Sequence, residues 1–319
     1  MNYIQQAYKG KRELWMFLIT AFLISGIFIV NLIVYLFTSK EDMQAAYDMM
    51  KTIPSNLSLV VNLLPFAFLL GLLFVMVKFI HERSILSLTT ARKKVDFKRF
   101  FLSFGLIVTI TILSFIMAYF LDPSQIQLQF NPVKFAILFF ISIILFPFQI
   151  GLEEYLFRGY LMQHIGIIVK NKWFPLIFTS VLFGVAHSAN PEVAEMGFIT
   201  MIFYIGTGLL LGIMTLMDDG LELALGFHLG NNLLAALLVT SDWSALQTDA
   251  IFKYTAEKAS TTVMEILVPV LVFYPIILFI FSKVYKWSDW KNKLFGSVVE
   301  PPKEDYKIIE DIVANDSQL

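Results

Sequence analysis

Long apolar stretches recur along this 319-residue chain, and no other feature limits its fold as strongly. A helix needs about 20 consecutive apolar residues to cross a hydrocarbon core roughly 30 Å thick. Backbone groups inside a bilayer must bond to one another, so such stretches fold as helices. The candidate stretches are residues 14–37, 57–80, 100–121, 133–163, 173–189, 197–217, 221–239 and 263–285. The sequence therefore predicts an all-α fold, a polytopic transmembrane helical bundle of about eight spans.

The composition agrees with a lipid bilayer as the surroundings of this chain. Hydrophobic residues make up 57% of it and charged residues 15%, whereas soluble domains carry about 25% charged residues. The net charge of −1 argues against a nucleic-acid partner, because such a partner calls for a basic face. The chain has no cysteine, which excludes disulfides, thiolate metal sites and a cysteine nucleophile.

No linker divides the chain, so we expect one transmembrane helical domain at 1–285 and a cytoplasmic tail at 286–319. Lys and Arg gather before the first span, in 78–99, in the turn after the fourth span and after the last span. By the positive-inside rule this alternation predicts an integral protein of the cell membrane with both termini in the cytoplasm. We expect residues 81–99 to form a basic surface helix and His81 to be solvated.

A few ionisable and polar side chains interrupt the apolar spans. They are Glu153, Glu154, Arg158, His187, His228 and Asn232. Placing a charged side chain at the bilayer centre costs about 2.5–3.5 kcal/mol, so these groups are functional candidates by default. Counted from the flanking loops at 1.5 Å per residue, they lie roughly 14–26 Å into the membrane. If the helices are straight they can converge, although Pro147 predicts a kink or break in the fourth span.

Helical spacing separates the two neighbouring glutamates. Glu154 and Arg158 are four residues apart and can form an ion pair. Glu153 lies about 100° around the helix and has no obvious local partner. A carboxylate near a histidine can act as a general base on water.

Several protease chemistries are absent from the sequence. The pair His81-Glu82 is followed by Ile85 where a zinc helix needs histidine, so there is no HExxH motif. There is also no Gly-x-Ser-x-Gly nucleophile elbow and no Gly-x-Gly-Asp string typical of a membrane aspartyl pair.

Three motifs follow one another in the apolar spans: Glu153-Glu154-x-x-x-Arg158, Phe183-x-x-x-His187 and His228-x-x-x-Asn232. Their order resembles the CPBP family (CAAX protease and bacteriocin-processing, also called ABI), which includes the type II CAAX prenyl endopeptidases. The resemblance covers a core at about residues 135–240. It implies a membrane-embedded CAAX-type endopeptidase that acts without a cofactor on a membrane-associated peptide or protein.

The resemblance also implies residue roles. Glu153 would activate the attacking water and His187 would assist it, while His228 and Asn232 would stabilise the oxyanion. Glu154 and Arg158 would support the site by holding the helix and tuning Glu153.

Other interpretations remain open. Glu153, His187 and His228 supply the ligand types of a His₂Glu zinc site, so a zinc-dependent version of the same hydrolysis is an alternative. A transporter also places polar groups at mid-membrane, but the inverted repeats typical of many transporters are not visible in the sequence. A non-catalytic scaffold or immunity protein could share the fold. Whether the substrate is prenylated is not decided by the sequence.

Overall fold

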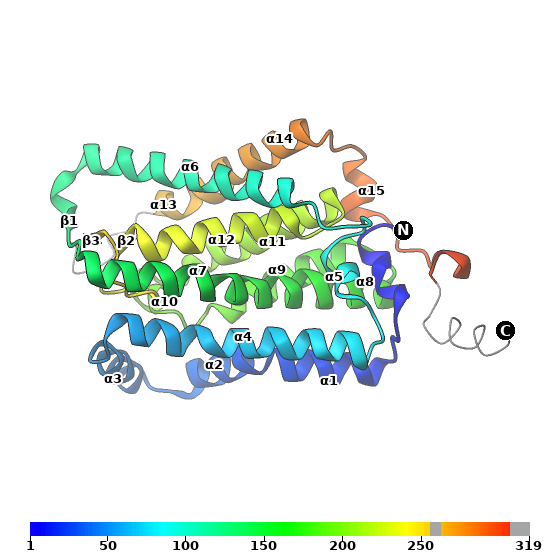
Figure 1. The fold of residues 1–319 in the computed structure, drawn as a ribbon, viewed down its shortest axis with the longest axis horizontal. Coiled ribbons are helices and arrows are strands. Elements are labelled where there is room, and N and C mark those ends of the chain that lie inside the picture. The colour runs from blue at the N-terminus through cyan, green and yellow to red at the C-terminus, as the bar shows by residue number, and fades with distance from the viewer. Residues whose placement is uncertain (256–262, 307–319) are drawn as a thin grey trace.

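Long helices run side by side along one axis of the molecule, in a computed structural model that describes residues 1–255 and 263–306 (Figure 1). They form a helical membrane bundle, which confirms the predicted fold class. The helices of ten or more residues are α1 (Leu14–Ile24), α2 (Gly26–Phe37), α3 (Lys40–Lys51), α4 (Ser55–Phe79), α6 (Phe97–Leu121), α7 (Pro132–Glu154), α9 (Trp173–Ala186), α11 (Thr200–Asp218), α12 (Glu222–Leu237) and α14 (Tyr274–Val284).

Shorter elements join or extend these helices. The short α-helices are α5 (Ile85–Thr89), α8 (Met162–Val169), α10 (Pro191–Met196), α13 (Val263–Val268) and α15 (Trp290–Phe295), π-helical turns span Tyr155–Leu161 and Pro269–Phe273, and 3₁₀ turns span Ile4–Lys9, Pro123–Gln125 and Lys303–Asp305. Three short strands, β1 (Ile126–Leu128), β2 (Val239–Thr240) and β3 (Phe252–Tyr254), pair in the order β1-β3-β2. β1 is antiparallel to β3 and β2 is parallel to it, so this small sheet ties together the loops at one end of the bundle.

The prediction of about eight spans is not confirmed. Within the described residues, five helices are long and apolar enough to cross a membrane: Ser55–Phe79, Phe97–Leu121, Pro132–Val169, Thr200–Asp218 and Ile266–Val284. A sixth span is possible if α1 and α2, which are bent by 59° at Ser25, cross together. α9 and α12 have 14 and 16 residues and are therefore only about 21 and 24 Å long. Each is shorter than a hydrocarbon core of roughly 30 Å.

The fourth predicted span is longer and more regular than expected. α7 continues through Pro147, and the helical rod runs on through the π-helical turn Tyr155–Leu161 into α8. The rod of Pro132–Val169 has 38 residues. Pro147 therefore does not break the fourth span, and the irregularity follows directly after Glu153 and Glu154. π-helical turns of this kind are frequent at functional sites.

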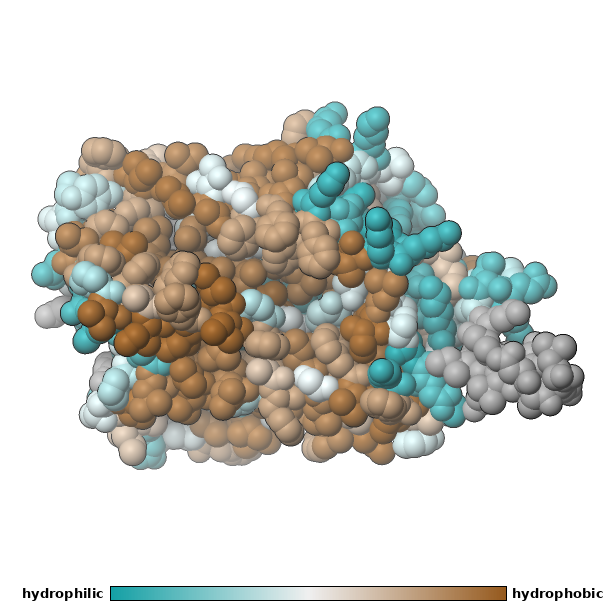
Figure 2. Space-filling model, viewed as in Figure 1, coloured by the Kyte–Doolittle hydropathy of each residue, from teal (hydrophilic) through white to brown (hydrophobic). Residues whose placement is uncertain are grey.

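Polar surface gathers at one end of the molecule, whereas apolar side chains cover most of the length of the helices (Figure 2). Exposed large side chains such as Phe22, Phe68 and Phe120 belong to this apolar surface. An exposed apolar surface of this extent is typical of contact with lipid. Together with the long apolar helices it makes the chain an integral membrane protein.

The two ends of the bundle differ in charge. We call the end that holds the N-terminus and α15 in Figure 1 the basic end; it comprises residues 1–13, 78–99, 170–173, 218–222 and 283–306. Its lysines and arginines include Lys9, Lys11, Arg12, Lys78, Arg83, Arg92, Lys93, Lys94, Lys98, Arg99, Lys170, Lys172, Lys283, Lys286, Lys291 and Lys293. The opposite end, built from α3, α10 and the three strands, is mainly acidic. In its described part it carries Lys40, Lys51, Lys134 and Lys253 beside Glu41, Asp42, Asp48, Asp122, Glu192, Glu195, Asp242 and Asp249.

Residues 81–99 do not form the expected surface helix. They hold the five-residue helix α5 and a loop, and α6 begins only at Phe97. Arg83 points inward and donates to the carbonyl of Ser87 at 2.9 Å and to Gln163. His81 is fully buried rather than solvated, because its ring contacts Thr20 and Tyr160. Polar partners inside this end of the bundle therefore replace the expected contact with water.

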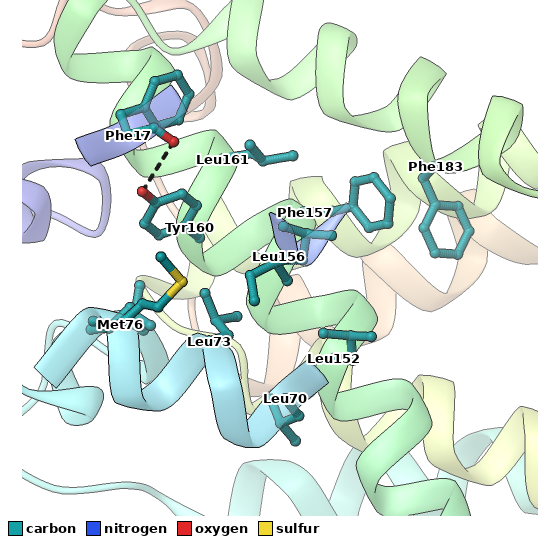
Figure 3. Close-up of a cluster of buried hydrophobic side chains, with 13 residues drawn as sticks. Phe17, Leu70, Leu73, Met76, Leu152, Leu156, Phe157, Tyr160, Leu161 and Phe183 are labelled. Atoms are coloured by element: carbon teal, nitrogen blue, oxygen red, sulfur yellow. Dashed lines mark hydrogen bonds between the residues drawn. The ribbon is translucent and has the colours of Figure 1, made fainter. Parts of the chain in front are cut away.

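An apolar cluster packs the bundle between its basic end and its middle (Figure 3). Side chains from α1, α4, the Pro132–Val169 rod and α9 meet there, and Leu73, Leu152, Leu156 and Tyr160 are completely buried. This cluster fixes the rod directly beside Glu153 and Glu154, so the position of both carboxylates is set by packing.

Candidate active site

Glu153 and Glu154 end α7 and are buried, with 2% and 0% of their surface exposed. Two ionised carboxylates cannot remain in such a place without partners that compensate their charge. Glu154 has the partner that its spacing predicted, because Arg158 Nη1 donates to Glu154 Oε1 at 2.9 Å. Arg158 also donates to the carbonyl of Gly208 at 3.0 Å, which joins the rod to α11.

His228 of α12 lies between the two glutamates. Its Nδ1 donates to Glu154 Oε1 at 2.8 Å, and its Nε2 is 3.5 Å from Glu153 Oε2. The sequence predicted His228 near this site but did not predict that Glu154 binds it. Glu154 therefore orients the imidazole ring, and Nε2 is the ring nitrogen that faces Glu153.

Glu153 is not without a local partner, contrary to the expectation from spacing. Gln149, one turn earlier on α7, donates from its side-chain amide to Glu153 Oε1. The other carboxylate oxygen, Oε2, is buried and has no hydrogen-bond partner. Glu153 thus has one oxygen held by Gln149 and one oxygen without a hydrogen bond, which lies 3.5 Å from His228 Nε2.

Asn232 joins the same network through Gln149. Asn232 Nδ2 donates to Gln149 Oε1 at 2.9 Å, and Asn231 Nδ2 donates to Asn232 Oδ1 at 3.1 Å. Sequence reasoning missed Gln149 and Asn231. A signal for Gln149 existed, since it is a polar residue four positions before Glu153 in an apolar span and so shares its helix face.

His187 directly follows the last residue of α9. Its Nδ1 donates to the carbonyl of Phe183 at 2.7 Å, which leaves Nε2 without a proton in the neutral ring. The ring stacks on Tyr204 of α11, with centroids 4.5 Å apart and planes 22° apart. Tyr204 was not a sequence candidate, because a tyrosine in an apolar span gives no signal of this contact.

One large cavity connects these side chains. Its volume is about 1250 Å³, and its lining includes Glu153, His187, His228, Asn232 and Gln149. Pockets for drug-sized molecules have about 300–1,000 Å³, so this cavity has room for several residues of a peptide. The structure therefore brings the four predicted catalytic residues to one cavity, and keeps Glu154 and Arg158 behind its wall.

A zinc site at Glu153, His187 and His228 receives no geometric support. Within residues 1–255 and 263–306, no group of three histidine, aspartate or glutamate side chains is close enough to hold one metal ion. Because Glu154 and the Phe183 carbonyl engage the Nδ1 atoms, each of the two rings has its Nε2 facing the cavity. Whether the hydrolysis is metal-free or zinc-dependent stays a prediction.

The fold and the site together define an integral membrane protein with a buried carboxylate, histidine and amide site open to a large cavity. Comparison with known families relates part of the chain to a more specific class of protein. Residues 132–234, which carry every residue of the site, match the family model described as "Type II CAAX prenyl endopeptidase Rce1-like". This match confirms the resemblance seen in the motifs and supports a CAAX-type intramembrane protease as the general class.

A relative extends the similarity beyond this segment. The chain is 27% identical over 253 residues to "Uncharacterized protein YyaK" of Bacillus subtilis (strain 168), covering 75% of this chain and 83% of that protein. The name of this relative assigns it no activity. No solved structure matches the chain.

Proposed function

We propose that the chain is an intramembrane endopeptidase that hydrolyses a peptide bond with a water molecule activated by Glu153. The observation that carries this proposal is the free carboxylate oxygen Oε2 of Glu153, which is buried at a cavity that His187, His228 and Asn232 also line. A general base must lie within reach of the proton that it removes, and Oε2 is the oxygen placed to do so. We propose further that Lys and Arg hold the basic end in the cytoplasm, with both termini on that side.

The proposed reaction has two proton transfers. Glu153 takes a proton from water as the water oxygen bonds to the substrate carbonyl carbon, and the carbonyl oxygen becomes an oxyanion. The tetrahedral intermediate then loses its C–N bond, and the leaving nitrogen receives a proton from Glu153, with His187 Nε2 assisting as the second acid–base group. Transfer by such positioned side chains typically contributes about 10²–10⁴-fold in rate.

His228 and Asn232 are the proposed donors to the oxyanion. His228 can donate from Nε2 only when both ring nitrogens carry protons, and the adjacent Glu153 and Glu154 supply the opposite charge for that cation. Asn232 has a second amide hydrogen beyond the one given to Gln149. Removal of one donor of this kind typically costs about 10²–10³-fold in kcat.

The proposal is tested by Glu153→Gln, with Glu195→Gln on the exposed face of α10 as a matched control. Peptide termini in the cell envelope are compared by mass spectrometry among wild type, both variants and a strain without the protein. We expect Glu153→Gln to give the peptide pattern of the strain without the protein, and Glu195→Gln to give the wild-type pattern. Cleavage by well-folded Glu153→Gln at the wild-type rate would refute the proposed role of Glu153.

A second assay, on purified protein, addresses the zinc alternative. The purified protein is treated with a strong chelator, and its metal content and its cleavage of the identified peptide are measured together. The proposal expects full activity in metal-free protein. Loss of activity on metal removal, restored by Zn²⁺, would favour the zinc-dependent mechanism.

A further inference from the structure

The cavity extends from the proposed site toward one end of the bundle. From Glu153 and His228 its lining continues to α3, to the turn between α3 and α4, to α10 and to residues 244–247. All of these segments lie at the end opposite to the N-terminus and α15 (Figure 1). Among the described lining residues, none comes from the basic end as defined above.

The path toward the basic end is filled. Leu152, Leu156 and Tyr160 are completely buried in the apolar cluster that packs α1, α4 and α9 against the rod (Figure 3). Protein interiors of this kind are close-packed, so the cluster separates Glu153 from the basic end. A substrate therefore reaches the site from the acidic end or from the adjoining bilayer.

The charges of the two ends indicate which side of the membrane the cavity faces. Lys and Arg gather at the basic end, whereas acidic side chains predominate at the described part of the other end. Short loops rich in Lys and Arg are retained in the cytoplasm. The end at which the cavity opens is then the non-cytoplasmic end of the protein.

We propose that the site takes its substrate from the non-cytoplasmic side of the membrane, as a peptide segment that lies at or beyond that face. This inference rests on the proposed function and names its substrate class. A cytoplasmic protein with a prenylated C terminus would meet the closed, basic end of the molecule. The family description is therefore a guide to the reaction and not to the substrate of this chain.

The walls of the cavity suit a peptide at the membrane surface. Phe28 of α2 and Phe66 of α4 present apolar surface, while Tyr47, Asn62 and Glu192 add polar groups to the same space. Tyr47 OH donates to the carbonyl of Ala189 at 2.8 Å, so α3 lies against the segment that follows His187. A segment with both apolar and polar residues would find partners along this path.

The absence of cysteine from the chain allows a direct test of which end faces outward. Ala46→Cys and Ala245→Cys place a thiol at exposed residues of the cavity lining, and Ser297→Cys places one at an exposed residue of the basic end. Each single-cysteine variant is produced in cells, which are treated intact with a membrane-impermeant maleimide and, in parallel, after permeabilisation. Full-length protein in the membrane fraction shows that each variant is made and inserted.

We expect the two cavity variants to be labelled in intact cells, and Ser297→Cys to be labelled only after permeabilisation. Labelling of Ser297→Cys in intact cells, with protection of Ala46→Cys and Ala245→Cys, would overturn the inference. The readout does not depend on catalysis. A chain without peptidase activity would therefore still report the direction of the cavity, so failure of the inference and failure of the proposed function are distinguishable.

The peptides that depend on Glu153 give a second measurement. If the Glu153→Gln comparison finds peptides, we expect their cut sites to map to secreted peptides or to outward-facing segments of membrane proteins. Cut sites confined to cytoplasmic proteins would overturn the inference while leaving the peptidase proposal intact.

Discussion

Gln149 links two side chains with different proposed tasks, because its amide donates to Glu153 and accepts from Asn232. A hydrogen bond to one carboxylate oxygen restrains the plane of the carboxylate, which keeps Oε2 in a defined place 3.5 Å from His228 Nε2. The same amide oxygen restrains Asn232, so base and oxyanion donor keep their relative position. Gln149 is therefore a positioning residue, since it acts through two residues that would touch the reacting atoms.

Replacing Gln149 by Met keeps a side chain of similar length but removes both hydrogen bonds. Hydrogen bonds to charged groups contribute about 1.5–3 kcal/mol, so we expect kcat to fall on the order of 10- to 100-fold. KM should stay close to the wild-type value, because the lost contacts orient catalytic groups and not the substrate. Both constants are measured on the peptide found by the Glu153→Gln comparison.

Gln163→Met is the matched control for this prediction. Gln163 is also buried in the Pro132–Val169 rod, but it bonds to Arg83 and to the carbonyl of Ser87 at the basic end. We expect the control to lower the unfolding temperature with little change in kcat of the folded fraction. Equal loss of kcat in both variants would mean that Gln149 has only a structural role.

The sequence predicted the contacts that lie within one helical turn better than those that depend on packing. The Glu154–Arg158 ion pair follows from four-residue spacing alone. The contact of His228 with Glu154 joins residues 74 positions apart, and it required knowledge of how α12 packs against α7. For the same reason the stacking of His187 on Tyr204 could not be predicted.

At the scale of elements, close helix contacts set the position of the histidine on α12. α12 packs on α6 through Gly226 and Gly230, where the two backbones approach each other. A methyl group at Gly226 would overlap the carbonyl oxygen of Phe100, and His228 follows two residues later. Small residues that permit such approach are typical of helix pairs in membranes.

We therefore expect Gly226→Ala to push α12 away from α6. Overpacking of this kind typically costs about 1–3 kcal/mol, and it should lower the unfolding temperature in detergent and displace His228 from Glu154. Gly71→Ala on α4 is the control, because no atom lies within 4 Å of the added methyl group. The control should be neutral or more stable by up to about 1 kcal/mol, since alanine favours helix. Equal stability of both variants would contradict the proposed contact.

Element boundaries also show why the predicted number of spans is not confirmed. Apolar composition predicts a helix in each stretch but does not fix its length. α9 ends at Ala186, directly before His187, whereas α12 spans only Glu222–Leu237 and contains its polar site residues. The bend lies at the pair Ser25-Gly26 within an otherwise apolar stretch, and Gly/Ser pairs are a known cause of sharp kinks. Nothing in the pattern of hydrophobic residues distinguishes a bent pair of helices from one straight span.

Across the whole molecule, the two ends of the bundle differ in structure. The opposite end holds the cavity, whereas the basic end is closed by a network of buried polar side chains. His81 is central to that network, because its ring contacts Thr20 of α1 at 3.2 Å, Tyr160 of the rod at 2.9 Å and the carbonyl of Lys11 at 2.9 Å. It thereby fastens the N-terminal segment to the core.

Burial lowers the pKa of His81 below its usual value of 6.5, and the nearby Arg83 adds to this effect. The folded protein therefore holds the ring neutral, while the unfolded chain protonates it near pH 6.5. The contribution of His81 to stability is fully present above pH 6.5, and it is lost progressively as the pH falls from 6.5 toward the lowered pKa of the folded state. We expect the unfolding temperature of the wild type to fall between pH 7.5 and pH 5.5.

His81→Gln tests this expectation, because glutamine keeps polar contacts but does not titrate. The variant should lose part of the pH dependence in this interval, with His164, 5.2 Å from His81 between ring centroids, as the other histidine of the network. Thr20→Val removes one partner of the ring without removing its titration, so it should lower the unfolding temperature equally at both pH values. If His81→Gln keeps the full wild-type slope, the pH dependence arises elsewhere and not from His81.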